Sequence, residues 1–273
     1  MSTGPTQPVA GRPKPWYQVA FQEAYLDLYM HRDQREAARA VRFLQEVLRF
    51  TPEDRLLDLC CGPGRHLALL GDKVGVAVGL DLSLVLLRRA HRHFVVLGGG
   101  EQASAESTRP LLIQADMLRL PLDMGVFDHV VNLFTSFGYF EREVENQGVL
   151  AEVARVLRPG GMLALDHINE PVMLGNLEPR SERELPDGRC VIEVRRWDAH
   201  ARRVEKDITC QRPDGLVRRW HESVRVYQPD ELESMMRSEG LEPVARHGDY
   251  DGNPWREDAP RMILLARRVG SNP

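Results

Sequence analysis

The sequence lacks the features that mark membrane, metal-binding and nucleic-acid-binding proteins. It has no apolar run long enough to span a bilayer and no charged-then-apolar leader, so we expect a cytoplasmic protein without membrane contact. Its four cysteines have no metal-ligand spacing and do not look like a disulfide framework, so we expect reduced thiols and no metal site. Lys and Arg number 36 against 40 Asp and Glu, and a net charge of -4 does not demand a nucleic acid.

The most informative feature present is a glycine turn between an apolar strand and a helical pattern. Residues 55–59 predict a short buried strand, residues 60–64 place two glycines around Pro63, and a helix begins near His66. Glycines let the backbone approach a bound molecule, and free N–H groups at a helix start face that molecule. The carboxylate of Asp58 would repel a pyrophosphate and attract an ammonium group.

A second carboxylate completes this pattern. Asp81 follows the apolar run 74–80, at about the spacing where an acid binds ribose hydroxyls. A carboxylate accepts two hydrogen bonds from a vicinal diol well. The ligand therefore has a ribose and a positive or zwitterionic end. S-adenosylmethionine fits this description, and NAD fits it poorly.

These residues resemble the motifs of the class I S-adenosylmethionine-dependent methyltransferases. The first motif of that family matches residues 58–64, and the acid after its second strand matches Asp81. Its aspartate near the adenine matches Asp116, its fourth strand matches residues 127–133, and the loop before its fifth strand matches residues 157–161. The resemblance implies an α/β fold with a Rossmann-like seven-stranded sheet, mostly parallel, ending in an antiparallel hairpin.

One position departs from the family pattern. Cys60 stands where the first glycine of the family motif usually lies. A side chain at that point needs a negative φ, so we expect one at Cys60.

The chain divides into four parts. Residues 1–15 predict a disordered arm, and residues 16–50 predict an N-terminal helical lid. Residues 51–170 and 228–270 alternate strands with helices and predict the methyltransferase domain. Residues 171–227 change to a two-residue alternation, which predicts a three-stranded antiparallel insert over the acceptor site.

The element boundaries follow from the apolar periodicity and from the proline and glycine positions. We expect helices near 16–30, 34–50, 65–71, 83–96, 143–157 and 229–239. We expect parallel strands near 55–60, 74–80, 110–114, 127–133 and 161–167, insert strands near 190–197, 204–211 and 217–227, and final strands near 242–247 and 262–267.

The resemblance implies a cofactor site at the carboxyl ends of the strands, covered by a tyrosine-bearing helix. The residues expected to bind S-adenosylmethionine are Tyr29, Asp58, Cys61, Gly62, Gly64, Asp81, Leu82, Asp116, Met117, Asn132 and Leu133. Asp81 and Asp116 have an alternative role as helix caps, and Met117 has an alternative role in the core.

The catalytic residues are harder to identify, because a base helps only when the acceptor must lose a proton before attack. Tyr139 lies in an aromatic loop after the fourth strand, and His167 follows the fifth strand. The family layout implies that both lie beside the methyl group. A wall that closes the core is the alternative for the loop, and a structural role is the alternative for His167.

The predicted function is methyl transfer from S-adenosylmethionine to a nitrogen or oxygen atom of a small-molecule acceptor by in-line displacement. We expect a monomer or homodimer without nucleic acid. The alternatives are a nucleic-acid or protein methyltransferase and a cofactor-binding protein without catalysis. Residues 132–135 lack the Asn-Pro-Pro-Tyr type of motif, which argues against a nucleic-acid substrate.

Overall fold

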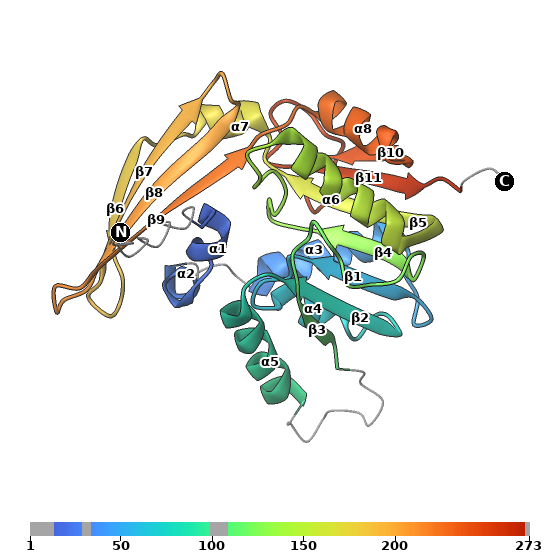
Figure 1. Ribbon diagram of the computed structural model, residues 1–273, viewed down its shortest axis with the longest axis horizontal. Helices are drawn as coiled ribbons and strands as arrows, with labels where there is room; N and C mark the ends of the chain where they lie inside the picture. Colours follow the sequence, from blue (N-terminus) through green and yellow to red (C-terminus); the bar gives the residue numbers. More distant parts are fainter. Residues whose placement is uncertain (1–13, 29–33, 99–108, 271–273) are drawn as a thin grey trace, which may run out of the picture.

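The structure is a computed structural model that describes residues 14–28, 34–98 and 109–270. It contains a seven-stranded sheet and a separate four-stranded sheet (Figure 1). The strands of the larger sheet are β1 (Arg55–Leu59), β2 (Val76–Asp81), β3 (Leu111–Gln114), β4 (Phe127–Asn132), β5 (Leu157–His167), β10 (Leu241–His247) and β11 (Met262–Arg268). The expected arm, residues 1–15, lies mostly outside the described residues.

The strand order confirms the predicted Rossmann-like fold. The order is β10-β11-β5-β4-β1-β2-β3, and β11 alone runs antiparallel to its neighbours. The parallel strands β1 to β5 therefore end at one edge, where the crossovers to the helices begin. Asp81 and Asn132, the last residues of β2 and β4, lie at that edge, and Asp58 is one residue from the end of β1.

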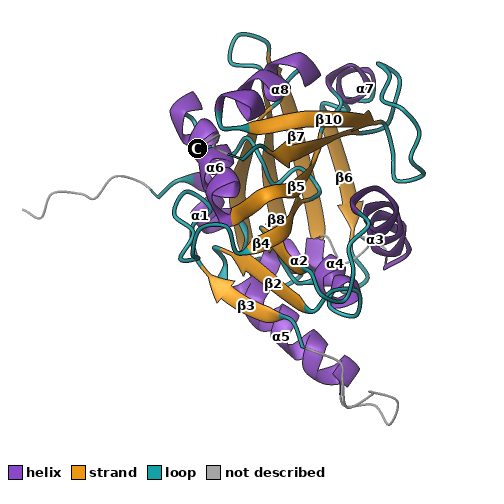
Figure 2. Ribbon diagram, turned by 90° about the vertical axis from the view of Figure 1, so that its right-hand side faces the viewer, coloured by secondary structure: helices purple, strands orange, loops and turns teal. Residues whose placement is uncertain are grey.

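Helices cover both faces of this sheet (Figure 2). One face carries α3 (Gln34–Leu48), α4 (Arg65–Leu70) and α5 (Leu84–Gly98), and the other carries α6 (Glu143–Val156) and α8 (Pro229–Ser238). Neighbouring residues of β1 alternate between the two cores, because successive side chains of a strand point to opposite faces. Leu57 and Leu59 pack on the α6 side, and Leu56 packs on the α3 side.

The N-terminal helix expected over 16–30 is broken into α1 (Trp16–Ala20) and α2 (Glu23–Leu28). The chain bends at Phe21, whose carbonyl accepts a hydrogen bond from the Ser83 hydroxyl at 2.5 Å instead of continuing the helix. Both short helices lie between the two sheets (Figure 1). No described helix has the length and apolar character that crossing a membrane requires.

The insert has one more strand than predicted. It consists of α7 (Glu170–Gly175) followed by β6 (Arg180–Glu184), β7 (Cys190–Asp198), β8 (Arg203–Gln211) and β9 (Val217–Arg225). These strands pair antiparallel in the order β6-β7-β8-β9. The sequence pattern missed β6, because its five residues Arg-Ser-Glu-Arg-Glu contain no apolar side chain. A charged edge strand of this kind resists pairing with other chains.

Gly79 of β2 marks the tightest packing between the sheet and α4. A Cβ there would lie 2.2 Å from Leu67 and 2.8 Å from the sulfur of Cys61. We expect Gly79→Ala to lower the free energy of unfolding by about 1–3 kcal/mol through overpacking. Gly175→Ala is the matched control, because a Cβ at Gly175 meets no atom within 4 Å, and we expect a change below about 0.5 kcal/mol. Urea denaturation measures both, and equal stability of the two variants would contradict this packing argument.

Candidate functional site

A cavity with about 590 Å³ of empty space, part of it open to solvent, lies at the carboxyl ends of β1, β2 and β3. Its floor comes from the glycine turn, through Cys60, Gly62 and Pro63. One wall comes from the ends of β2 and β3 and the start of α5, and a largely aromatic roof comes from α1, α2 and the loop after β4. The wall residues are Asp81, Leu82, Leu86, Ala115, Asp116 and Met117, and the roof residues are Tyr17, Phe21, Tyr25, Ser136, Tyr139 and Phe140.

The carboxylate of Asp81 joins the end of β2 to the glycine turn. It accepts hydrogen bonds from the backbone N–H of Gly62 at 2.9 Å and from that of Ser83 at 2.8 Å. The bond to Ser83 is the capping contact that the sequence left open as an alternative. Burial raises the pKa of Asp81 to about 6, against the lowering effect of its bonds to backbone N–H groups. Because each carboxylate oxygen has two lone pairs, Asp81 retains acceptor capacity for a ligand in the cavity.

Three alternate residues of the glycine turn have the left-handed backbone conformation. Cys60, Gly62 and Gly64 have φ values of 64°, 56° and 76°. The expectation of a negative φ at Cys60 is therefore wrong. The left-handed conformation lets the next residue, Cys61, donate its backbone N–H to Leu80 of β2 at 3.0 Å, and it costs on the order of 1–3 kcal/mol for a residue with a side chain.

Different structural constraints favour glycine at positions 64 and 62. A Cβ at Gly64 would lie 2.8 Å from the ring of Phe94, so that position is closed by packing against α5. A Cβ at Gly62 would meet only Leu86, at 4.0 Å, so the constraint there is the positive φ and the open space above the backbone. That space is part of the cavity.

Two buried oxygen atoms near the ends of β1 and β4 have no hydrogen-bond partner within the described part of the chain. They are Oδ2 of Asp58 and Oδ1 of Asn132. The amide nitrogen of Asn132 is occupied, since it donates to the carbonyl of Leu59 at 3.0 Å. Burial, together with the charge of Asp81, raises the pKa of Asp58 to about 7. Buried acceptors without donors need explanation, and the ammonium group of a bound methionine moiety is a donor of the right charge.

Some of the predicted cofactor residues line the cavity, and others do not. Gly62, Asp81, Leu82, Asp116 and Met117 line the cavity. The predicted residues that do not line it are Asp58, Cys61, Gly64, Asn132 and Leu133. Tyr29 lies outside the described residues.

The two predicted catalytic residues have different surroundings. Tyr139 lines the cavity, and its ring packs 4.9 Å from that of Trp16 and 5.7 Å from that of Phe21. His167 is fully buried away from the lining, where its Nε2 accepts the backbone N–H of Tyr227 at 3.4 Å. Burial lowers the pKa of His167 to about 4, which keeps the ring neutral.

Several lining residues were not predicted as site residues. Tyr17, Phe21 and Tyr25 recur at intervals of four in the segment predicted as a lid, but of the tyrosines there only Tyr29 was named as a cofactor-binding residue. The interval of four was the available signal, because it places three rings on one face of a helix. Its meaning depended on whether that face meets the core or a cavity, which the spacing does not encode.

Comparisons with known proteins identify the class of domain. Residues 56–161 match the family model described as a methyltransferase domain. A dTDP-3-amino-3,4,6-trideoxy-alpha-D-glucopyranose N,N-dimethyltransferase from Streptomyces venezuelae is 28% identical over 241 residues, covering 86% of this chain and 96% of that protein.

Solved structures show the same fold. A sugar N-methyltransferase from a Streptoalloteichus species is 25% identical, with a TM-score of 0.65 and 99% of both chains covered. An S-adenosylmethionine-dependent methyltransferase from Clostridium acetobutylicum has a TM-score of 0.74 at 17% identity, covering 90% of this chain and 96% of that one.

The strand order, the glycine turn with its acids and the matched domain together define a class I S-adenosylmethionine-dependent methyltransferase. The chain is an enzyme of this class, and S-adenosylmethionine is its cofactor, as the sequence predicted.

Replacing Asp81 tests its proposed role as the ribose acceptor. Asp81→Asn keeps the shape of the side chain but removes its charge, so S-adenosylhomocysteine should bind more weakly by about 1.5–3 kcal/mol. Titration calorimetry measures the affinity, and circular dichroism checks the fold. Asp214→Asn, in an exposed turn of the insert, is the control. Unchanged affinity in a folded Asp81→Asn variant would mean that Asp81 only caps the backbone after β2 and does not bind the ribose.

The raised pKa values of Asp58 and Asp81 predict pH-dependent cofactor binding. The pKa is about 7 for Asp58 and about 6 for Asp81, and both values exceed the ordinary 3.8. Ionisation of each carboxyl group therefore destabilises the cofactor-free fold as the pH rises through that pKa. A ligand with an ammonium group and a diol favours the ionised forms. The affinity for S-adenosylhomocysteine should therefore be greatest above about pH 7 and fall as the pH drops below it. Calorimetry across this range measures the slope, and an Asp58→Asn variant with the same slope would contradict the assignment.

Proposed function

We propose that this methyltransferase transfers methyl groups to the amino group of a sugar carried on a nucleotide, a small-molecule acceptor. The observation that carries the proposal is the position of Tyr139, which places a hydroxyl-bearing aromatic ring in the same cavity as Asp81 and Asp116. The full-length similarity to an amino-sugar N,N-dimethyltransferase and to a sugar N-methyltransferase supports an amine as the acceptor.

The residues of the cavity suit the two halves of the cofactor. Asp81 would hold the ribose, Leu82, Asp116 and Met117 would surround the adenine, and Asp58 with the glycine turn would receive the methionine end. The bound cofactor supplies an activated methyl group. The chain must align the nucleophile in line with that group and exclude water.

A neutral amine attacks through its own lone pair, so no buried base is required. Burial raises the pKa of Tyr139 well above its ordinary value, which keeps its hydroxyl protonated at neutral pH. We assign Tyr139 the role of orienting the acceptor by a hydrogen bond. The neutral ring of His167 lies outside the lining, and the rings of Phe137 and Tyr227 pack against it. We propose that His167 thereby supports the loop of residues 133–140 after β4, which we call the acceptor wall.

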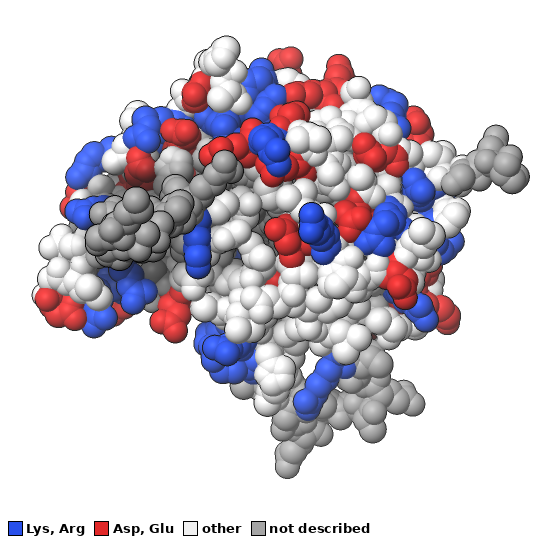
Figure 3. Space-filling view, in the orientation of Figure 1, with Lys and Arg blue, Asp and Glu red and all other residues white. Residues whose placement is uncertain are grey.

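The surface supports a small-molecule acceptor over a nucleic acid. On the face shown in Figure 3, basic and acidic side chains alternate and form no continuous basic stripe. A nucleic-acid site requires clustered Lys and Arg to contact the phosphates. We further propose that α1 and α2 act as a lid, that the insert covers the acceptor, and that the enzyme works as a monomer or homodimer.

Turnover of a defined acceptor tests this function. The probe is dTDP-3-amino-3,4,6-trideoxy-α-D-glucopyranose, with release of S-adenosylhomocysteine and added methyl groups followed by mass spectrometry. The matched control is the same nucleotide sugar with a hydroxyl in place of the amine. We expect methylation of the amine alone. Methylation of the hydroxyl sugar alone would assign oxygen as the acceptor atom, and turnover of neither would reject this acceptor class.

The role of Tyr139 predicts a modest, specific defect. Tyr139→Phe should lower turnover by about tenfold or less, because one neutral hydrogen bond contributes roughly 0.5–1.5 kcal/mol. Affinity for S-adenosylhomocysteine should stay nearly unchanged, since the hydroxyl acts on the acceptor. Full turnover by Tyr139→Phe would mean that the ring serves only as a wall.

A further inference from the structure

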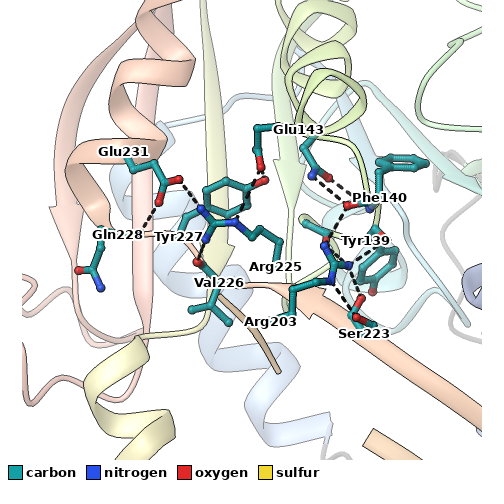
Figure 4. Close-up of polar contacts among 12 residues, drawn as sticks. Tyr139, Phe140, Glu143, Arg203, Ser223, Arg225, Val226, Tyr227, Gln228 and Glu231 are labelled. Carbon is teal, nitrogen blue, oxygen red and sulfur yellow. Dashed lines mark hydrogen bonds and ion pairs between the residues drawn. The ribbon is translucent and has the colours of Figure 1, made fainter. Parts of the chain in front are cut away.

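One side chain of the insert contacts three successive backbone carbonyls of the loop after β4. Arg203, the first residue of β8, reaches out of the insert to the loop after β4 (Figure 4). Its Nη1 donates to the carbonyl of Phe140 at 3.0 Å, and its Nη2 lies 3.3 Å from the carbonyls of both Gly138 and Tyr139. The remaining contacts go to Ser223 of β9, at 2.9 Å to its carbonyl and 2.8 Å to its hydroxyl.

All three nitrogens of this guanidinium are therefore occupied by neutral oxygen acceptors. No carboxylate lies within ion-pair distance of Arg203 in the described part of the chain. The neighbouring Arg225 differs, because it pairs with Glu231 at 2.5 Å and lies 3.8 Å from Glu143 (Figure 4). A cation that contacts only carbonyls and a hydroxyl holds the backbone in place and does not neutralise an acid.

The backbone of the loop after β4 also contacts the insert and α1 directly. Gly138 has a φ of 89°, and a Cβ there would lie 2.4 Å from the carbonyl of Arg225, so the loop backbone touches the end of β9. The backbone N–H of Arg225 donates to the carbonyl of Gly138 at 2.8 Å. The carbonyl of Tyr139 also accepts the indole N–H of Trp16 at 3.2 Å, so the lid and the insert meet on the same backbone group.

We propose that Arg203 is a positioning residue that sets the place of the Tyr139 ring, and that the insert thereby controls how the acceptor is held. The proposal rests on the role of Tyr139 proposed above. A guanidinium has five N–H groups in a fixed plane, and here it spans three consecutive carbonyls and a serine. Lysine retains the charge but presents one nitrogen, which cannot span these acceptors.

The test uses fluorine NMR of protein labelled with 3-fluorotyrosine, because this readout needs no acceptor. The chain has six tyrosines, and the Tyr139 signal is assigned from its absence in Tyr139→Phe. We expect Arg203→Lys to displace or broaden that signal. Arg196→Gln is the control, since Arg196 lies on the same sheet and is half-exposed, pairing with Asp207 at 2.7 Å. Its Tyr139 signal should stay at the parent position.

Ser223→Ala provides a second, milder variant if Arg203→Lys folds poorly. It removes the hydroxyl acceptor of Nε without touching the cavity lining, so the Tyr139 signal should move in the same direction by a smaller amount. A parent-like Tyr139 signal in both folded variants would overturn the proposal. A signal displaced equally in Arg196→Gln would overturn it too, because the effect would then belong to the insert as a whole.

Turnover separates this proposal from the proposed function. With an acceptor in hand, Arg203→Lys should lower kcat by about tenfold or less, as Tyr139→Phe does, while S-adenosylhomocysteine affinity is retained. In a Tyr139→Ala background the same change should cost less than about threefold, because both residues act through one ring. Additive losses would refute positioning through Tyr139. A displaced Tyr139 signal together with full turnover by Tyr139→Ala would instead refute the role proposed for Tyr139.

Discussion

The buried carboxylate of Asp166 holds together the segments from which the acceptor wall starts. Arg261 contacts both of its oxygens, at 2.8 and 2.6 Å, and the hydroxyl of Tyr250 donates to it at 2.7 Å. The backbone N–H of Phe134 donates to it at 2.8 Å, and that of Thr135 donates to its carbonyl at 3.1 Å. Phe134 and Thr135 have φ values of 55° and 61°, a strained pair that persists because these bonds over-determine it. Removing one partner of such a buried pair costs about 3–5 kcal/mol, so the bend after β4 is held firmly.

The acceptor wall is thus held at both of its ends. Asp166 sets the direction in which the chain leaves β4, and Arg203 holds the carbonyls of Gly138, Tyr139 and Phe140 at the other end. Between them the loop has little freedom, because Ser136 also donates its hydroxyl to the carbonyl of Leu133 at 2.9 Å. A wall fixed in this way can align a nucleophile without reorganising during the reaction, which is the main contribution that methyl transfer from an activated donor requires.

The sequence predicted the larger sheet well, because its information is local: apolar runs of strand length separated by helices leave few arrangements. It failed where a contact between distant residues decides the outcome. Phe21 breaks the first helix because its carbonyl meets Ser83, and Cys60 takes a positive φ because the next N–H reaches Leu80. Arg203 was missed for the same reason. It is one of several arginines in the insert, and only the folded structure shows that its side chain contacts the loop after β4.

The two halves of the site differ in how far apart their residues lie in the chain. The half that we propose for the donor comes from β1, β2, β3 and the turns after them, within the 56–161 segment that the family model matches. The roof of the cavity joins α1 and α2, which precede that segment, to the loop after β4, which lies within it. Arg203 of the insert contacts the backbone of this loop. The donor half must present two buried carboxylates whose ionisation is unfavourable without a ligand, and this chemistry is the same for every acceptor. The matched segment therefore identifies the cofactor. In our proposal the lid and the insert select the acceptor, because their contacts to the Gly138–Phe140 backbone position the loop without touching Asp58 or Asp81.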